Sequence, residues 1–355
     1  MPLVVIDGMP GVGKTALALK WAHRNAAMFP DGVLFHDLRA HGPAGRPATP
    51  EDVLAASLHA VGVDSHSIPA DLWDRAALYR TALTGRRMLI VLDDAATADQ
   101  VRALLPGAPG CMVLVTSRNR LAGLVARDGA TRLSLQPLSA EDSSALLHSI
   151  AGATLNGARP EAVSALSGHC GHLPLALRIA AEHFSAGPHH SLEEVVGELS
   201  DPRGRLDFLS CAGDTAASVR AVFSWSYRDL PEDVARAFRL IGASAPEGVS
   251  PQSAAGILGV PQDIAVRLAH LLCHVNLLES TASGRYRCNT LLAAYARELA
   301  AAEDRAVLSH SATGRARRQH RAAVALPPAP AQPSGLPEEA AEEHGHHHEH
   351  GVALR

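Results

Sequence analysis

Short apolar runs alternate with Ala- and Leu-rich segments over the first third of the chain. Leu3–Ile6, Met88–Leu92 and Cys111–Val115 contain no charged residue, and Gly32–Leu38 is a fourth candidate strand. Strands buried on both faces have continuous apolar sequences, and their alternation with helices is typical of a parallel sheet. The helices are predicted at about Thr15–Ala27, Glu51–Val61 (with Pro50 in its first turn) and Asp74–Leu83. The pattern predicts an α/β domain with helices on both faces of the sheet.

The pattern changes after about Arg132. Residues 133–204 are predicted to be helical, with a break at Gly168–Pro174. Residues 205–304 are predicted to form helices, then a hairpin from Asn276–Ser280 and Arg285–Cys288, then a last helix that starts near Thr290. Helices followed by a two-stranded hairpin indicate a winged helix. We therefore divide the chain into an α/β domain (1–132), a small helical domain (133–204), a winged-helix domain (205–304) and a tail (305–355).

The tail has the composition of a disordered segment. An arginine cluster at 315–321 precedes a proline-rich stretch, and an acidic, His-rich run extends from Glu338 to His350. Imidazole groups at 346–348 and 350 could bind Ni²⁺ or Zn²⁺ loosely. A solvated tail without a metal is the interpretation that we prefer.

Composition and charge set limits on partners and location. The chain has 355 residues, of which 47% are hydrophobic, and a net charge of −4. A nucleic-acid surface would have to be a local patch, because sequence-independent affinity comes from Lys and Arg that meet phosphates. The five cysteines are scattered without a CxxC pair, which predicts reduced thiols. With no signal peptide and no apolar stretch of about 20 residues, we expect a soluble, cytoplasmic protein.

A phosphate-binding loop directly follows the first predicted strand. The residues Gly8, Met9, Pro10, Gly11, Val12, Gly13, Lys14 and Thr15 meet the G-x-x-x-x-G-K-[ST] spacing, and Ala16 follows in the predicted helix. Glycines let backbone N–H groups converge on phosphate oxygens, next to the positive end of the helix. Lys14 would reach the β- and γ-phosphates and Thr15 would hold Mg²⁺. Lys14 and Lys20 are the chain's only lysines among 32 basic residues, which supports a functional reason for Lys14.

Polar residues at the ends of two later strands complete a candidate catalytic site. Asp93 and Asp94 end the second long apolar run, and Arg118 follows the third. In phosphate-loop enzymes an acid at the first position assists Mg²⁺. We predict that Asp93 acts on Mg²⁺, that Asp94 orients or activates the attacking water, and that Arg118 senses the γ-phosphate. The alternative for the acids is helix capping, and the alternative for Arg118 is an ordinary solvated arginine.

Together these motifs resemble the NB-ARC group of signal-transduction ATPases, which belong to the STAND class of P-loop NTPases. The module of actinobacterial antibiotic-regulator proteins is the more similar form. The resemblance also uses five further segments, namely 89–94, 115–118, 171–176, 226–230 and Gly284–Arg287 before the last helix. It implies an ATPase domain, a small helical (ARC1-like) domain and a winged-helix domain that close over ADP or ATP. Pro174 would pack on adenine, and ATP hydrolysis would be a slow reset.

The chain departs from the family pattern in three ways. Cys288-Asn289-Thr290 stands where the family has Met-His-Asp, whose His contacts the β-phosphate of ADP. In the family this contact holds the closed, ADP-bound state and is here called the ADP lock. Asn289 can donate only a neutral hydrogen bond, so the ADP lock is expected to be about tenfold weaker if the family's His is charged. Thr290 can still cap the last helix. The chain also begins at the first strand, without the upstream residues that contact the base in the family, so weaker base contacts are expected. The flanking DNA-binding domain and the repeat sensor of the family are expected to be absent.

Three functional hypotheses remain. The leading one is a nucleotide-dependent switch in signal transduction or transcriptional regulation, including that of secondary metabolism, with a protein partner or self-association on activation. The second is a DNA-binding regulator that acts through residues 216–302 and the arginine cluster, which is disfavoured because no dense basic stripe follows a recognition helix. The third is a degenerate interaction module that binds no nucleotide. It is suggested by Asn289 and by the start of the chain at the first strand.

Overall fold

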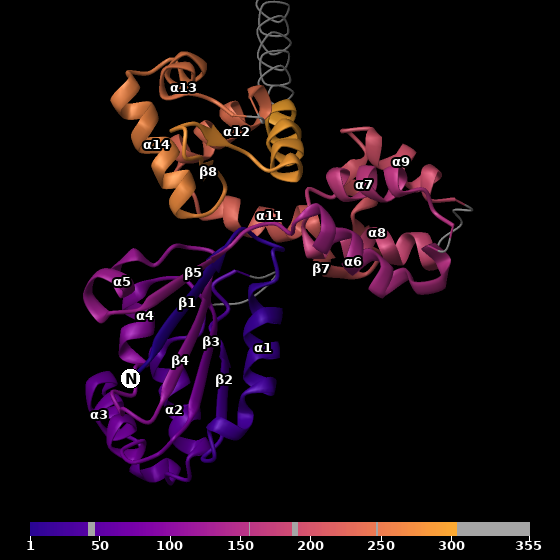
Figure 1. The fold of residues 1–355 in the computed structure, drawn as a ribbon. Coiled ribbons are helices and arrows are strands. Elements are labelled where there is room, and N and C mark those ends of the chain that lie inside the picture. The colour runs from indigo at the N-terminus through magenta and orange to yellow at the C-terminus, as the bar shows by residue number, and fades with distance from the viewer. Residues whose placement is uncertain (42–46, 156, 187–190, 246–247, 304–355) are drawn as a thin grey trace, which may run out of the picture. The chain divides into compact units, whose positions relative to one another are not determined.

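The first part of the chain forms a five-stranded parallel sheet. A computed structural model describes residues 1–41, 47–155, 157–186, 191–245 and 248–303. The strand order is β2-β3-β4-β1-β5, and every neighbouring pair is parallel (Figure 1). The strands are β1 Leu3–Gly8, β2 Val33–Asp37, β3 Leu89–Ala95, β4 Met112–Ser117 and β5 Thr131–Leu135. The predicted parallel α/β sheet is therefore confirmed.

Helices cover both faces of this sheet. They are α1 Lys14–Arg24, α2 Pro50–Ala60, α3 Leu72–Ala82, α4 Ala98–Ala103 and α5 Ala122–Asp128, with short 3₁₀ turns at Ala26–Met28 and Ser65–Ser67. On one face Ile6, Val91 and Leu114 pack against Ala18 of α1. Pro50 opens α2 as predicted, and Thr49 caps that helix by accepting a hydrogen bond from the N–H of Asp52. The predicted loop that precedes Pro50 lies in part at 42–46, outside the described residues.

The edge strand β5 was not predicted. It pairs with β1, from Val4 against Thr131 to Gly8 against Leu135. Its sequence Thr-Arg-Leu-Ser-Leu alternates polar and apolar residues, and its first four residues are exposed. A half-exposed edge strand therefore lacks the continuous apolar run that marked its neighbours. The predicted boundary at Arg132 falls inside this strand.

A helical region follows the sheet. It contains α6 Ala140–Ala151, a 3₁₀ turn at Gly152–Leu155, α7 Pro160–His169, α8 Pro174–Ala186, α9 Leu192–Ser200 and α10 Arg205–Phe208. The predicted break lies between α7 and α8, where Gly171 and His172 have φ angles of 58° and 56°. Because this left-handed pair reverses the chain, α8 begins at Pro174.

The last described region is mostly helical and carries two small hairpins. Its elements are β6 Ser210–Cys211, β7 Asp214–Ser218, α11 Val219–Arg228, α12 Glu232–Ser244, α13 Pro251–Leu258, α14 Gln262–His274, β8 Glu279–Ser280, β9 Tyr286–Arg287 and a helix at 290–303. The predicted hairpin is present as β8 and β9, with strands of only two residues. The β6–β7 hairpin was not predicted. The predictions for the tail at 305–355, including the His-rich run, concern residues outside the described part of the chain.

All five cysteines are free, in agreement with the predicted thiols. Among the described residues, none of the helices is by itself long and apolar enough to cross a membrane.

Candidate phosphate-binding site

The loop between β1 and α1 has a backbone that its glycines make possible. Gly8, Gly11 and Gly13 have φ angles of 147°, 80° and 99°. A Cβ atom at Gly8 would lie 2.7 Å from the carbonyl oxygen of Leu135. Since other residues rarely adopt these angles, the glycines allow the loop to wrap the N-terminus of α1. Met9, Pro10 and Val12 are buried, whereas Thr15 and Ala16 are exposed at the start of α1.

Lys14 lies folded back over this loop. Its Nζ donates hydrogen bonds to the carbonyl oxygens of Gly8 and Met9, each at 2.9 Å. Burial, assisted by the charge of Arg118, lowers the pKa of Lys14 from 10.5 to about 7, although Asp94 opposes the shift. An anion placed against Nζ would raise this pKa again, because it favours the charged ammonium.

The lowered pKa predicts a pH-dependent affinity for nucleotides. Above pH 7 the free protein increasingly holds Lys14 as a neutral amine, so binding of a phosphate that needs the ammonium takes up a proton. The Kd for ADP should therefore rise between about pH 7.5 and 9, by up to about tenfold per pH unit. Calorimetry in two buffers of different ionisation enthalpy measures both the Kd and the proton uptake. Lys14→Met should show no uptake, and a wild-type Kd independent of pH would contradict the prediction.

Asp93 and Thr15 form a set of oxygen atoms suited to a hard cation. The Oγ1 of Thr15 lies 2.9 Å and 3.1 Å from the two carboxylate oxygens of Asp93, and the Oγ1 of Thr116 also donates to this carboxylate. Burial raises the pKa of Asp93, and the two hydroxyl groups oppose the shift only in part. A buried carboxylate that has only neutral hydroxyl partners among its described hydrogen bonds fits an adjacent Mg²⁺, which prefers oxygen ligands.

Asp94 is held by a residue that the sequence analysis missed, His41. The backbone N–H of His41 donates to Asp94 Oδ2 at 2.6 Å, and its Nδ1 lies 2.9 Å from Oδ1. The backbone of Asp94 has a φ of 52°, and its N–H donates to Thr116 Oγ1 at 2.9 Å. Burial would raise the pKa of Asp94, but the hydrogen bonds of His41 and the charge of Arg118 outweigh it and lower the pKa. No sequence motif pointed to His41, which lies 53 positions before Asp94 and reaches it only because β2 and β3 are neighbours.

Arg118 joins the end of β4 to α11. Its Nε lies 3.7 Å from Asp94 Oδ1, so the side chain reaches the predicted acid. Its Nη1 donates to the carbonyl oxygen of Val222 at 2.7 Å and to Ser226 Oγ at 2.9 Å, and the Trp225 ring centroid is 5.6 Å from its Cζ. The pKa of Arg118 is lowered by burial. The alternative of an ordinary solvated arginine is wrong, because Arg118 is only 8% exposed.

The start of α8 lies against the loop. The N–H of Leu175 donates to the carbonyl oxygen of Gly11 at 3.3 Å. The Cγ of Pro174 would be 3.8 Å from a Cβ atom at Gly13. Pro174 is thus placed beside the loop.

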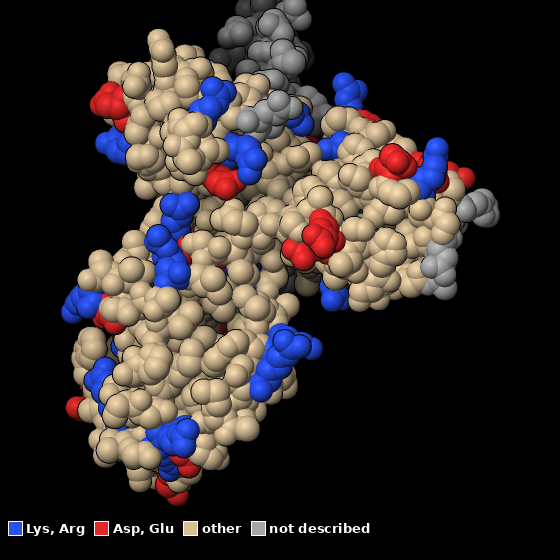
Figure 2. Space-filling model, viewed as in Figure 1, with Lys and Arg blue, Asp and Glu red and all other residues tan. Residues whose placement is uncertain are grey.

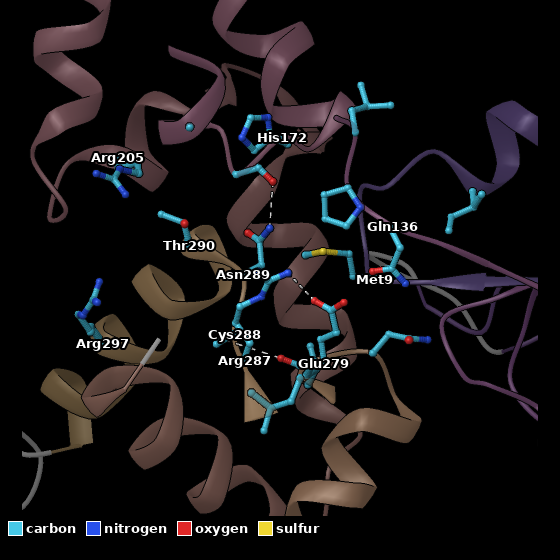
Figure 3. A pocket seen from close by; sticks show the side chains of 18 of the residues that line it. Met9, Gln136, His172, Arg205, Glu279, Arg287, Cys288, Asn289, Thr290 and Arg297 are labelled. Carbon is cyan, nitrogen blue, oxygen red and sulfur yellow. Dashed lines mark hydrogen bonds and ion pairs between the residues drawn. The ribbon is translucent and has the colours of Figure 1, made fainter. Parts of the chain in front are cut away.

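Asn289 connects the turn before α8 to the last described helix. Its Nδ2 donates to the carbonyl oxygen of Gly171 at 3.0 Å, and its Oδ1 accepts the N–H of Leu291 at 3.0 Å, so Asn289 itself caps the last helix. Asn289 and Met9 both line a cavity of about 870 Å³, shown in Figure 3. Of the predicted nucleotide contacts, only these two line that cavity.

The parallel sheet, the glycine-rich loop and the acids at the end of β3 define a P-loop NTPase domain. Comparison with known proteins identifies the family of this domain. Residues 1–156 match the NB-ARC domain, and this part of the chain belongs to that family.

Two curated relatives extend the similarity beyond the NB-ARC match. The regulatory protein AfsR of Streptomyces coelicolor is 43% identical over 305 residues, which is 86% of this chain and 30% of AfsR. The AfsR of Streptomyces griseus is 43% identical over 300 residues, again 30% of its length. The chain thus spans less than a third of these relatives. A Walker-type ATPase of Pyrococcus abyssi has a similar fold, with a TM-score of 0.56 at 12% identity over 83% of this chain and 91% of that one.

Proposed function

We propose that this chain is a nucleotide-dependent switch that binds ADP or ATP with Mg²⁺ and acts in signal transduction or transcriptional regulation. The observation that carries the proposal is the contact of Thr15 Oγ1 with the Asp93 carboxylate beside the buried Lys14. The phosphate-binding lysine, a hydroxyl and an acid that suit Mg²⁺ are thereby in one place. Membership of the NB-ARC family and similarity to the regulatory AfsR proteins support a regulatory role, including one in secondary metabolism.

Each residue has a distinct role in this proposal. Lys14 binds the β- and γ-phosphates in place of the two loop carbonyls that it now contacts. Thr15 and Asp93 would hold Mg²⁺, which neutralises charge on the phosphate oxygens when it is bound. Asp94 orients or activates the attacking water, and Arg118 senses the γ-phosphate. Because Arg118 already contacts α11, its engagement by a phosphate would compete with that contact.

The regions after the sheet would close over the nucleotide. We propose an ARC1-like domain at 133–204 that supplies Pro174 to adenine, and a winged-helix domain at 205–304 that supplies Asn289. The amide nitrogen of Asn289 already donates to Gly171, and its oxygen accepts from Leu291. Asn289 can therefore offer ADP at most a neutral hydrogen bond. ADP is then held less tightly than it would be by a charged His, and a protein partner or a second copy is engaged on activation.

Direct DNA binding is the weaker candidate. In the view of Figure 2, Lys and Arg side chains of the described residues form small separate groups, mixed with acids, and no continuous basic stripe crosses this face. Sequence-independent binding to DNA needs such a surface. A sequence-selective, salt-sensitive gel shift would reverse this ranking.

A switch and an ordinary ATPase differ in turnover. We expect tight binding of ADP, measured by equilibrium dialysis, together with a steady-state ATP turnover below about 1 s⁻¹, the low end of ordinary enzymes. Turnover well above that value would contradict the switch. Failure of both nucleotides to bind would contradict the site and favour a nucleotide-free module.

A further inference from the structure

His41 is placed to control Asp94. It directly contacts the carboxylate, and its side chain is only 7% exposed. Its two donors meet both carboxylate oxygens of Asp94, the backbone N–H at Oδ2 and Nδ1 at Oδ1. One residue therefore holds both oxygens of the carboxylate.

Backbone hydrogen bonds between the segments of His41 and Asp94 also hold this carboxylate in place. The N–H of Leu38 donates to the carbonyl oxygen of Asp93 at 2.8 Å, and the N–H of Ala40 donates to that of Asp94 at 3.2 Å. Together with the left-handed backbone of Asp94, these bonds fix where its carboxylate points. The segment 38–41 thus extends the pairing of β2 with β3 beyond the ends of both strands.

A carboxylate held in this way is poorly prepared to act on water. A general base must present a free lone pair within hydrogen-bond distance of the proton that it accepts. His41 occupies one lone pair on each oxygen of the Asp94 carboxylate, so fewer lone pairs remain for a water molecule. On the other side Arg118 approaches Oδ1 to 3.7 Å, so a cation and two donors surround Asp94.

We infer that His41 is a positioning residue that restrains Asp94 and keeps ATP hydrolysis slow. The inference rests on the proposed function, because it needs ATP at this site. Release of the His41 side chain would free Oδ1 of Asp94 for the attacking water. Slow turnover would then be a property of the segment 38–41 after β2 and would not require the loss of a catalytic residue.

The test is the rate of hydrolysis of bound ATP in a single turnover. His41→Ala should raise this rate about tenfold, which corresponds to about 1.4 kcal/mol, with the Kd for MgATP within about twofold of wild type. His41→Asn should keep the wild-type rate, because its amide nitrogen can replace Nδ1 as the donor. His59→Ala removes an exposed histidine of the same domain and should change nothing. If His41→Ala unfolds, His41→Phe takes its place, since it lacks the donor but keeps the bulk.

Three results would overturn the inference while leaving the proposed function intact. They are an unchanged or lower rate in His41→Ala with ATP still bound, an equal gain in His41→Asn, and a gain that persists when Asp94→Asn is added. Loss of MgATP binding by the wild-type protein would instead remove the proposed function itself.

Discussion

Asp94→Asn should lower the single-turnover rate of ATP hydrolysis by at least about 100-fold and leave MgATP bound. The change keeps the shape of the side chain and removes the proton acceptor, and general base catalysis contributes about 10²–10⁴-fold. Radiolabelled ATP at an excess of protein measures the rate. A dialysis experiment on the same samples measures binding.

The control is Asp74→Asn, which changes an exposed acid in the first turn of α3. It should leave the rate unchanged. A wild-type rate in Asp94→Asn would show that Asp94 has only a structural role, anchoring the segment at Ala40 and His41. In that case the inference about His41 would also lose its basis.

Arg118→Met should lower the free energy of unfolding by about 2–5 kcal/mol and weaken the binding of ATP, which carries the γ-phosphate, without weakening that of ADP. Methionine fills much of the same space but leaves the carbonyl oxygen of Val222 and the hydroxyl of Ser226 without their donor. A buried polar group without a partner costs about 1–3 kcal/mol. Urea unfolding monitored by tryptophan fluorescence is suitable, because Trp225 lies against the guanidinium.

Arg120→Met is the matched control for Arg118. Arg120 lies in the same loop, and no side-chain hydrogen bond is described for it. We expect it to leave both the free energy of unfolding and the binding of ATP close to wild type. Equal destabilisation by the two variants would mean that the contacts of Arg118 with α11 contribute nothing specific.

The parallel sheet was predictable because its central strands are wholly apolar. A strand that is buried on both faces has a continuous apolar sequence, as in Leu89–Leu92 and Val113–Val115, which are all buried. β5 has no such apolar run, since it pairs on one side only and its first four residues are exposed. The β6–β7 hairpin was missed because its strands are short and contain no continuous apolar run.

The site was predictable where function depends on spacing along one segment. The glycines, Lys14 and Thr15 fall within one continuous segment at the start of α1, and the two acids follow an apolar run. His41 and Ser226 could not be predicted in the same way, because their partners are 53 and 108 positions away. Nor did the sequence indicate that Asn289 would use both ends of its amide in protein hydrogen bonds.

The central claim is that a nucleotide binds at Gly8–Thr15. The most direct test extracts the nucleotide that co-purifies with the full chain and identifies it by chromatography, alongside Lys14→Ala and the control Lys20→Ala. We predict ADP at close to one equivalent in wild type and Lys20→Ala, or on addition of MgADP if the weak lock releases it, and none in Lys14→Ala. Folded wild-type protein that neither carries nor retains an adenine nucleotide, or equal retention by Lys14→Ala, would contradict the account.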